Sequence, residues 1–89
     1  MAKPYKQYRH RRTGLIFRFA YDDADPELLH IYARHLTTPE DAIRTFFTGH
    51  TEWDAAHARF ETRSETHTLT WFWVVPNSVV QVLTCMREA

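Results

Sequence analysis

The side chains that could do chemistry gather in the last third of the chain. They are Arg59, Glu61, Arg63, His67 and Arg87. The first three recur at every second position, so a strand would point them all to one face. Metal-independent RNA cleavage needs a base near the ribose 2′-hydroxyl, cations that stabilise the charge on phosphorus, and an acid for the leaving oxygen, and residues of these types supply such groups. The same spacing also fits a solvated polar face of an antiparallel sheet, on which the charges pair with one another.

Other chemistries find little support in the sequence. His30 and His35 are five residues apart, about 140° around a helix, whereas two metal ligands on one helix are spaced by three or four residues. There is no HExxH, CxxC or acidic calcium loop, and the two glycines do not build a GxGxxG or GxxxxGK[ST] loop. Ser64 and Ser78 lack the elbow sequence of a serine hydrolase. We therefore expect no metal and no cofactor.

Three strand-like runs must position the candidate residues. They span residues 57–63, 66–75 and 79–86, and the turn Pro76-Asn77-Ser78 separates the last two. The middle run alternates in polarity, and from Phe72 onward both of its faces are apolar. We expect this run to be the central strand, covered on both sides at that end, with the last run returning antiparallel beside it.

Two short helices are predicted in front of these strands. Asp25 and Pro26 form a helix-start signature, with Asp25 as the N-cap and Pro26 at the first helical position. A second start follows, with Thr38 as the capping hydroxyl and Pro39 in the first turn. Gly49 is expected to end this second helix.

The remaining stretches complete a single domain. Residues 15–21 are expected to be a strand that adds an edge to the sheet, and residues 48–56 a connecting loop with Trp53 tucked onto the domain. The fold class is therefore α+β, a small antiparallel sheet of three to four strands packed by two short helices. This domain spans residues 15–89 and follows a basic N-terminal arm, residues 1–14. The predicted core consists of Ile43, Phe46, Leu69, Trp71, Trp73, Val82 and Leu83.

The net charge of zero hides a strong asymmetry along the chain. Residues 1–18 carry six cations and no acid, so the rest of the chain has a net charge of −6. A basic arm attracts phosphate, because each neutralised phosphate releases counterions, and Tyr5, Tyr8 and His10 add faces for base stacking. The alternative is an arm that stays solvated or docks on the acidic body of the protein itself. The arm residues expected to bind nucleic acid are Lys3, Lys6, Arg9, Arg11 and Arg12.

Cys85 is the single cysteine, and its apolar surroundings predict a buried structural thiol in a reducing compartment. No apolar stretch approaches the roughly 20 residues that a membrane helix needs. We therefore expect a cytoplasmic protein without membrane contact.

Three segments resemble the RelE/BrnT-type ribonuclease toxins, namely HIYARHLTTPEDAIRTFF, HARFETR and VVQVLTCMREA. The resemblance covers residues 28–89 and includes a histidine-bearing helix before a second helix start, a strand with an arginine, and a final strand with a small hydroxyl residue and an arginine. It implies a RelE/BrnT-like antiparallel sheet packed by helices, cleavage of RNA, and a cognate antitoxin that covers the site.

The matching positions are His35, Arg59, Thr84 and Arg87. Met86 departs from the pattern, because an arginine is common at its position in these families. Arg87 is thereby displaced by one residue, a shift that in a strand turns a side chain to the opposite face.

The sequence thus predicts a toxin-type, metal-independent endoribonuclease of a toxin–antitoxin system. Its partners would be RNA and a cognate antitoxin or another protein, and the sequence is compatible with a homodimer. We expect His35 or Glu61 as base or acid, and Arg59, Arg63 and Arg87 as phosphate ligands, all meeting where the first helix ends at the polar edge of the sheet. The alternative is a non-enzymatic module on the same scaffold that binds nucleic acid or protein, which is favoured if His35, Arg59 and Arg87 lie on separate faces.

Overall fold

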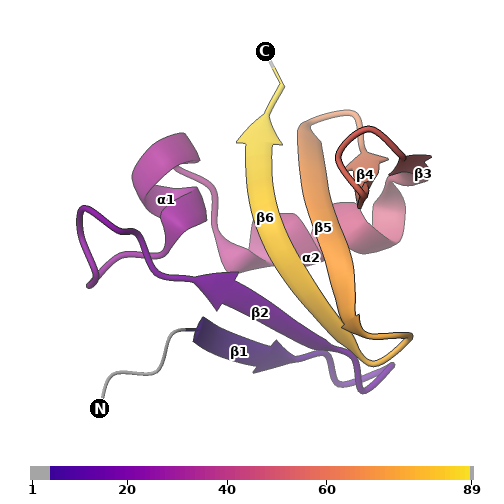
Figure 1. Cartoon of the computed structure of the whole chain (residues 1–89), viewed down its shortest axis with the longest axis horizontal. Coiled ribbons are helices and arrows are strands. Elements are labelled where there is room, and N and C mark those ends of the chain that lie inside the picture. The colour runs from indigo at the N-terminus through magenta and orange to yellow at the C-terminus, as the bar shows by residue number, and fades with distance from the viewer. Residues whose placement is uncertain (1–4, 89) are drawn as a thin grey trace.

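A computed structural model describes residues 5–88 as one six-stranded sheet with two helices (Figure 1). The elements are β1 (Tyr5–Arg9), β2 (Ile16–Ala20), α1 (His30–His35), α2 (Pro39–Thr48), β3 (His50–Asp54), β4 (Arg59–Arg63), β5 (His67–Val75) and β6 (Val79–Arg87). The strand order is β1-β2-β6-β5-β4-β3, and all neighbours are antiparallel except β2 and β6, which are parallel. The α+β class is confirmed, but the prediction of three to four antiparallel strands was too low. Neither described helix is long and apolar enough to cross a membrane.

The two strands missing from the prediction are the edges of the sheet. β1 belongs to the segment expected as a basic arm, and β3 to the segment expected as a loop. Both are short, and neither has a buried residue, so the sequence offered little apolar alternation to reveal them. Charged residues suit such edges because they discourage pairing with another chain. Trp53 on β3 is 55% exposed rather than tucked away, with its ring packed against Phe60.

β2 lies inside the sheet rather than at its edge. It pairs with β1 on one side and with β6 on the other, where Phe17 lies beside Val80 and Phe19 beside Val82. Parallel pairing requires the chain to leave the sheet and return in the same direction, and both helices and three strands are formed on the way. β6 consequently joins the two halves of the sheet (Figure 1).

The first helix was predicted to start too early. α1 begins at His30, with Leu29 as its N-cap and without a capping side chain. Asp25 instead holds a turn, because its carboxylate accepts a hydrogen bond from the N–H of Glu27. Leu29 also forms a β-bridge with Tyr21, which keeps the chain extended until the helix begins.

Both ends of α2 were predicted correctly. Thr38 is the N-cap, and it forms a capping box with Asp41 through bonds of 3.2 and 3.0 Å. Gly49 is the C-cap. A Cβ atom on Gly49 would lie 2.7 Å from the carbonyl oxygen of Arg63, so only glycine allows the end of β4 to approach this closely.

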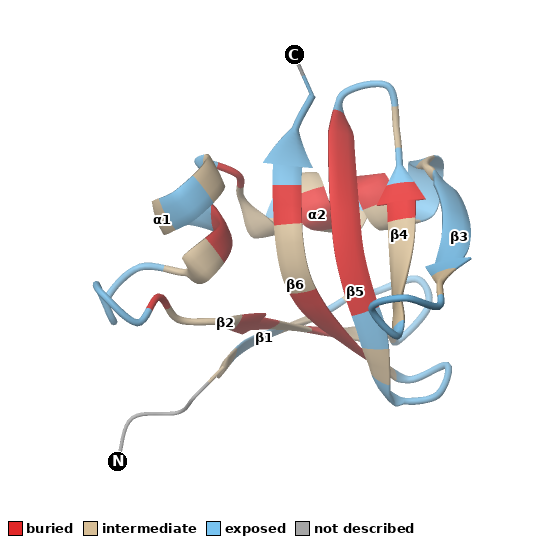
Figure 2. Cartoon of the chain, turned by 45° about the horizontal axis from the view of Figure 1, so that its top comes forward, coloured by how far each residue is buried: buried red, intermediate tan, exposed pale blue. Residues whose placement is uncertain are grey.

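The hydrophobic core lies between the sheet and α2 (Figure 2). Leu83 was wrongly assigned to it, because the pairing of β5 with β6 shifts after Thr70 and leaves Leu83 without a direct partner. The buried core consists of Phe17, Phe19, Ile31, Ala42, Leu69, Trp71, Val80, Val82 and Cys85. Ile43, Phe46 and Trp73 of the predicted core pack against it and stay partly exposed.

β5 is central as predicted. However, its first half is covered, whereas the sequence predicted cover on the half that begins at Phe72. Residues His67 to Trp71 are buried, whereas Phe72, Val74 and Val75 are 37%, 39% and 49% exposed. β4 pairs with β5 no further than Trp71, so the later half of β5 has lost one neighbour. Figure 2 shows the exposed residues toward the β5–β6 turn.

Cys85 is fully buried, as predicted. Burial raises the pKa of its thiol to about 11. Its backbone carbonyl accepts a 2.6 Å hydrogen bond from the hydroxyl of Thr37, which fastens the junction of α1 and α2 to β6.

Candidate functional sites on the two faces of the sheet

The sheet has two unequal faces. α2 packs on one of them, here the α2 face, where the ring of Phe46 lies 4.8 Å from that of Trp71. The opposite face is here the open face. Because side chains alternate along a strand, Phe60, Leu69 and Cys85 belong to the α2 face and their direct neighbours to the open face.

Three of the predicted site residues share the open face. Arg59 and Glu61 flank Phe60, whose ring stacks on Trp71 at 4.6 Å, so both point away from α2. Arg63 follows at the same spacing on β4. The sequence prediction that these three lie on one side of a strand is confirmed.

Arg87 does not join them. It lies two residues beyond Cys85, opposite His67, and therefore points to the α2 face. Met86 takes the open-face position instead, as the one-residue displacement in the sequence implied. Along β5, the levels of Arg59 and Arg87 are five residues apart, which is about 17 Å in a strand. The expected meeting of Arg87 with Arg59 is therefore wrong.

His35 lies on α1 rather than on the sheet. It ends α1, and its ring lies 6.3 Å from that of His30, despite the five-residue spacing. The buried carboxylate of Asp22 accepts a 3.1 Å hydrogen bond from Nε of Arg34 and lies 3.4 Å from Nδ1 of His30. Burial alone would raise the pKa of Asp22, but the hydrogen bonds from Arg34 and from backbone N–H groups outweigh it and lower this pKa. This cluster ties α1 to the turn that follows β2.

The open-face charges differ in how well they are paired. Nε of Arg63 donates a 2.7 Å hydrogen bond to Glu61, and this bond and the charge of Glu61 raise the pKa of Arg63. Such pairing is expected if these residues form a solvated polar face. Nε of Arg59, in contrast, is buried and has no hydrogen-bond partner within residues 5–88. The carboxylate of Asp54 lies 3.8 Å from it, beyond hydrogen-bond range.

A second arginine, which was not predicted as a site residue, lies on the open face. Arg18 on β2 lies beside Gln81, and Gln81 lies beside Phe72. On the next strand, Arg59 lies one residue before Phe60, which pairs with Trp71. It therefore stands near the level of Phe72, just beyond the last paired residues of the two strands. Nε of Arg18 is also buried without a partner in the described chain, and its guanidinium carbon lies 3.9 Å from the centre of the Tyr5 ring. We call the line of Arg18, Gln81, Phe72 and Arg59 the arginine row.

The predicted basic arm contributes exposed cations at the edge of the sheet. Lys6 and Arg9 lie on β1, three residues apart and hence on opposite faces, while Arg11 and Arg12 lie in the turn before β2. Lys3 lies outside the described residues. The arm is therefore partly an element of the sheet rather than a segment apart from it.

A cavity of about 410 Å³ opens on the α2 face, at the end of the sheet that carries Arg87. It is bounded by the junction of the two helices, the first turns of α2, the start of β5 and the end of β6. Its lining residues are Leu36, Thr37, Asp41, Arg44, Thr66, His67 and Arg87. Of these residues, the sequence had indicated Arg87 and His67 as groups that could do chemistry. Asp41 carried only a helix-cap signal, and Arg44 carried none.

The carboxylate in this cavity is already engaged. Asp41 accepts hydrogen bonds from the N–H of Thr38 at 3.0 Å and from Arg44 at 2.7 Å. Burial alone would raise the pKa of Asp41, but the hydrogen bonds from Thr38, the charge of His67 and the bond from Arg44 lower it. Arg44 is thereby held at the cavity, with more than half of its side chain exposed.

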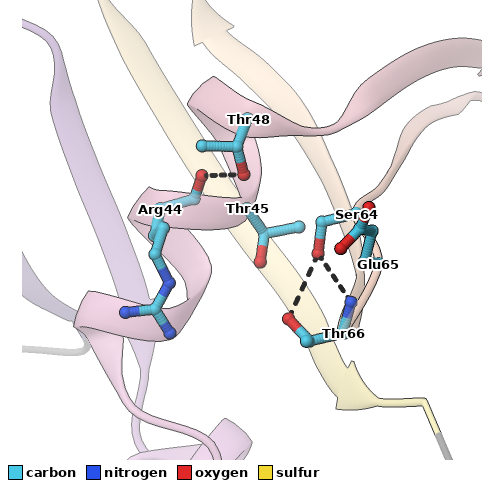
Figure 3. Close-up of a pocket in the computed structure, with 6 residues that line it drawn as sticks. All are labelled: Arg44, Thr45, Thr48, Ser64, Glu65 and Thr66. Atoms are coloured by element: carbon cyan, nitrogen blue, oxygen red, sulfur yellow. Dashed lines mark hydrogen bonds between the residues drawn. The ribbon is translucent and has the colours of Figure 1, made fainter.

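A neighbouring hollow of about 290 Å³ separates α2 from the turn between β4 and β5 (Figure 3). Its hydroxyl groups serve local structure. Thr48 donates to the carbonyl of Arg44 at 2.8 Å, and Ser64 accepts from the N–H of Thr66 at 3.3 Å. In Figure 3, the guanidinium of Arg44 points away from Ser64.

Comparisons with protein-family models, curated proteins and solved structures return no match for this chain. The resemblance to the RelE/BrnT-type toxins therefore rests on the sequence motifs alone.

Proposed function

We propose that the chain binds single-stranded RNA across the open face of its sheet. The observation that carries the proposal is the arginine row, in which two arginines from different strands stand at one level on either side of Gln81 and the 37% exposed Phe72. Proteins that bind single strands combine cations that track the backbone with aromatic faces on which bases stack. The row offers both.

The distance between the two arginines and the packing of their side chains support RNA binding. Three strand spacings separate Arg18 from Arg59, about 14 Å along the sheet, which suits contacts to separate phosphates of one strand. A buried Nε shows that each side chain lies down on the sheet with its stem packed. A guanidinium whose stem is already packed loses little freedom when it binds a phosphate, with which it forms a charge-assisted bond.

The salt dependence of binding tests the proposal. Affinity for a short uridine-rich RNA with a 5′-hydroxyl end would be measured by fluorescence anisotropy over a range of salt concentrations. Arg18→Gln and Arg59→Gln should each weaken binding and reduce the log–log salt slope by about 0.7, the value of one phosphate contact to a single strand. Arg44→Gln, which removes an exposed arginine from the other face, is the matched control and should leave the slope unchanged. Equal slopes in all four proteins would contradict the proposal.

The second candidate is a toxin-type endoribonuclease on the same face. It is favoured by the three residues Arg59, Glu61 and Arg63, which share that face. In this candidate, Glu61 takes the proton of the 2′-hydroxyl, the 2′-oxygen attacks phosphorus, and the 5′-oxygen leaves and takes a proton from water. Arg59 and Arg63 bind the phosphate, and a protein partner such as an antitoxin would inhibit by covering the face. The bond from Arg63 to Glu61 and the absence of Arg87 from this face are the reasons that binding ranks first.

Incubation of total RNA with the protein in EDTA separates the two candidates. The binding proposal expects wild-type protein to leave RNA intact. Cleavage that is lost in Glu61→Gln and in Arg59→Ala, and kept in Arg87→Ala, would instead establish the endoribonuclease. Glu52→Gln, on the neighbouring strand opposite Glu61, is the matched control for the loss of one carboxylate.

A further inference from the structure

We propose that the cavity on the α2 face is an oxyanion site that takes a phosphate monoester. Its volume of about 410 Å³ falls within the range of small-molecule pockets. It lies across the sheet from the arginine row, so this inference does not depend on RNA binding at the open face.

His67 supplies the first argument. It lines the cavity although only 7% of its surface is exposed. Nδ1 lies 2.8 Å from the hydroxyl of Thr66, and that contact fixes the ring. Nε2 has no hydrogen-bond partner within residues 5–88. A nearly buried imidazole that keeps one ring nitrogen free is a ready hydrogen-bonding group for a ligand in the cavity.

The charge of the cavity is the second argument. Arg44 and Arg87 both line it, and within residues 5–88 Arg87 forms no ion pair. The one carboxylate in the lining, Asp41, already accepts bonds from Thr38 and Arg44. The lining therefore has an excess of positive charge and an excess of donors.

This set of donors selects the ligand class. Guanidinium groups match the geometry of phosphate oxygens, and two of them beside an imidazole favour a doubly charged tetrahedral group. A phosphate monoester has that charge near neutral pH, whereas the diester of a nucleic-acid backbone carries a single charge. The monoester could belong to a free small molecule or to the 5′-phosphorylated end of an oligonucleotide, which share this chemistry.

The experiment measures binding by calorimetry to the full chain. The probes are inorganic phosphate, a nucleoside 5′-monophosphate, and a short DNA oligonucleotide with either a 5′-phosphate or a 5′-hydroxyl end. DNA lacks the 2′-hydroxyl, so no cleavage complicates the measurement. Arg87→Gln should weaken binding of phosphate by about ten-fold or more, since bonds to charged groups are at stake. His67→Gln should act in the same direction. Arg34→Gln, which removes a half-exposed arginine of α1 outside the cavity lining, should have no effect.

The outcomes are distinct. Binding of the small phosphates, lost in Arg87→Gln, supports the site with a free ligand, and binding of the 5′-phosphorylated oligonucleotide alone supports it with a nucleic-acid end. Equal binding of both oligonucleotides with no binding of the small phosphates overturns the inference, as does wild-type affinity in Arg87→Gln. The exposed position of Arg87 makes its variant safe for folding, and thermal unfolding of each variant checks the more buried His67.

Discussion

Asp22 carries a buried negative charge that several hydrogen bonds stabilise. Its carboxylate accepts bonds from Arg34 and from the N–H groups of Ala24 and Asp25, and it lies close to His30. These bonds explain why its pKa is lowered although burial opposes ionisation. The charged form is therefore part of the folded structure.

We predict that Asp22→Asn removes stability at neutral pH and much less in acid. The folded pKa of Asp22 is lower than the unfolded value of about 3.9, so its contribution is present above that value and is lost as pH falls through the folded pKa. Urea unfolding at pH 6 and at pH 2 measures this, with the exposed Asp23→Asn as the control. A destabilisation of Asp22→Asn that is equal at both pH values would show that the charge contributes nothing.

At the scale of elements, short sequence motifs correctly predicted the features that bonds between nearby residues determine. The cap at Thr38, the stop at Gly49 and the alternation of β5 are each encoded within a few residues, and the structure contains all of them. The signature at Asp25 failed, because its carboxylate bonds the next turn instead of starting a helix. β1 and β3 were missed because edge strands need little apolar pattern.

The candidate sites could not be predicted from residues that are neighbours in the sequence. The arginine row combines four strands, and the partners Arg18 and Gln81 are 63 positions apart. No window of sequence reveals such a row, and the only local sign was a charged residue between Phe17 and Phe19. The cavity likewise draws on the ends of separate elements. The alternation of Arg59, Glu61 and Arg63 was correctly predicted, since it lies within one strand.

The capping box of α2 gives a prediction at this scale. Thr38→Ala removes the hydroxyl that accepts the N–H of Asp41, and it should lower the free energy of unfolding by about 1 kcal/mol, the usual value of an N-cap. Thr48→Ala, at the exposed end of the same helix, is the control and should cost less. Denaturant unfolding of both variants measures the difference, and equal losses would show that the box does not hold the helix start.

At the scale of the whole molecule, one side chain connects most of the core. The ring of Trp71 contacts Phe46 on α2, Phe60 on β4 and Trp73 on its own strand, and Nε1 donates a 2.9 Å bond to Thr62. It therefore links the helix layer to the sheet and satisfies its one polar group internally.

We expect Trp71→Ala to lower the free energy of unfolding by about 3–5 kcal/mol, as for other large aromatic residues in cores. Trp53→Ala, on the edge strand, removes a ring that is 55% exposed and should cost far less. Chemical denaturation with circular dichroism detection compares them. A loss below about 1 kcal/mol for Trp71→Ala would mean that the core does not depend on this ring.

The position of β6 in the sheet affects how the protein folds during its synthesis on the ribosome. β6 is synthesised after the other five strands of the sheet, and it holds β1 and β2 to β5, β4 and β3. The hairpin of β1 and β2 is made first, so it must wait with the aromatic face of Phe17 and Phe19 uncovered until the strand 63 positions later emerges. Long-range pairing of this kind slows folding and leaves apolar surface open to other chains. The nascent chain is therefore most exposed to misassociation while β6 has not yet emerged, and a chaperone would protect it most at that stage.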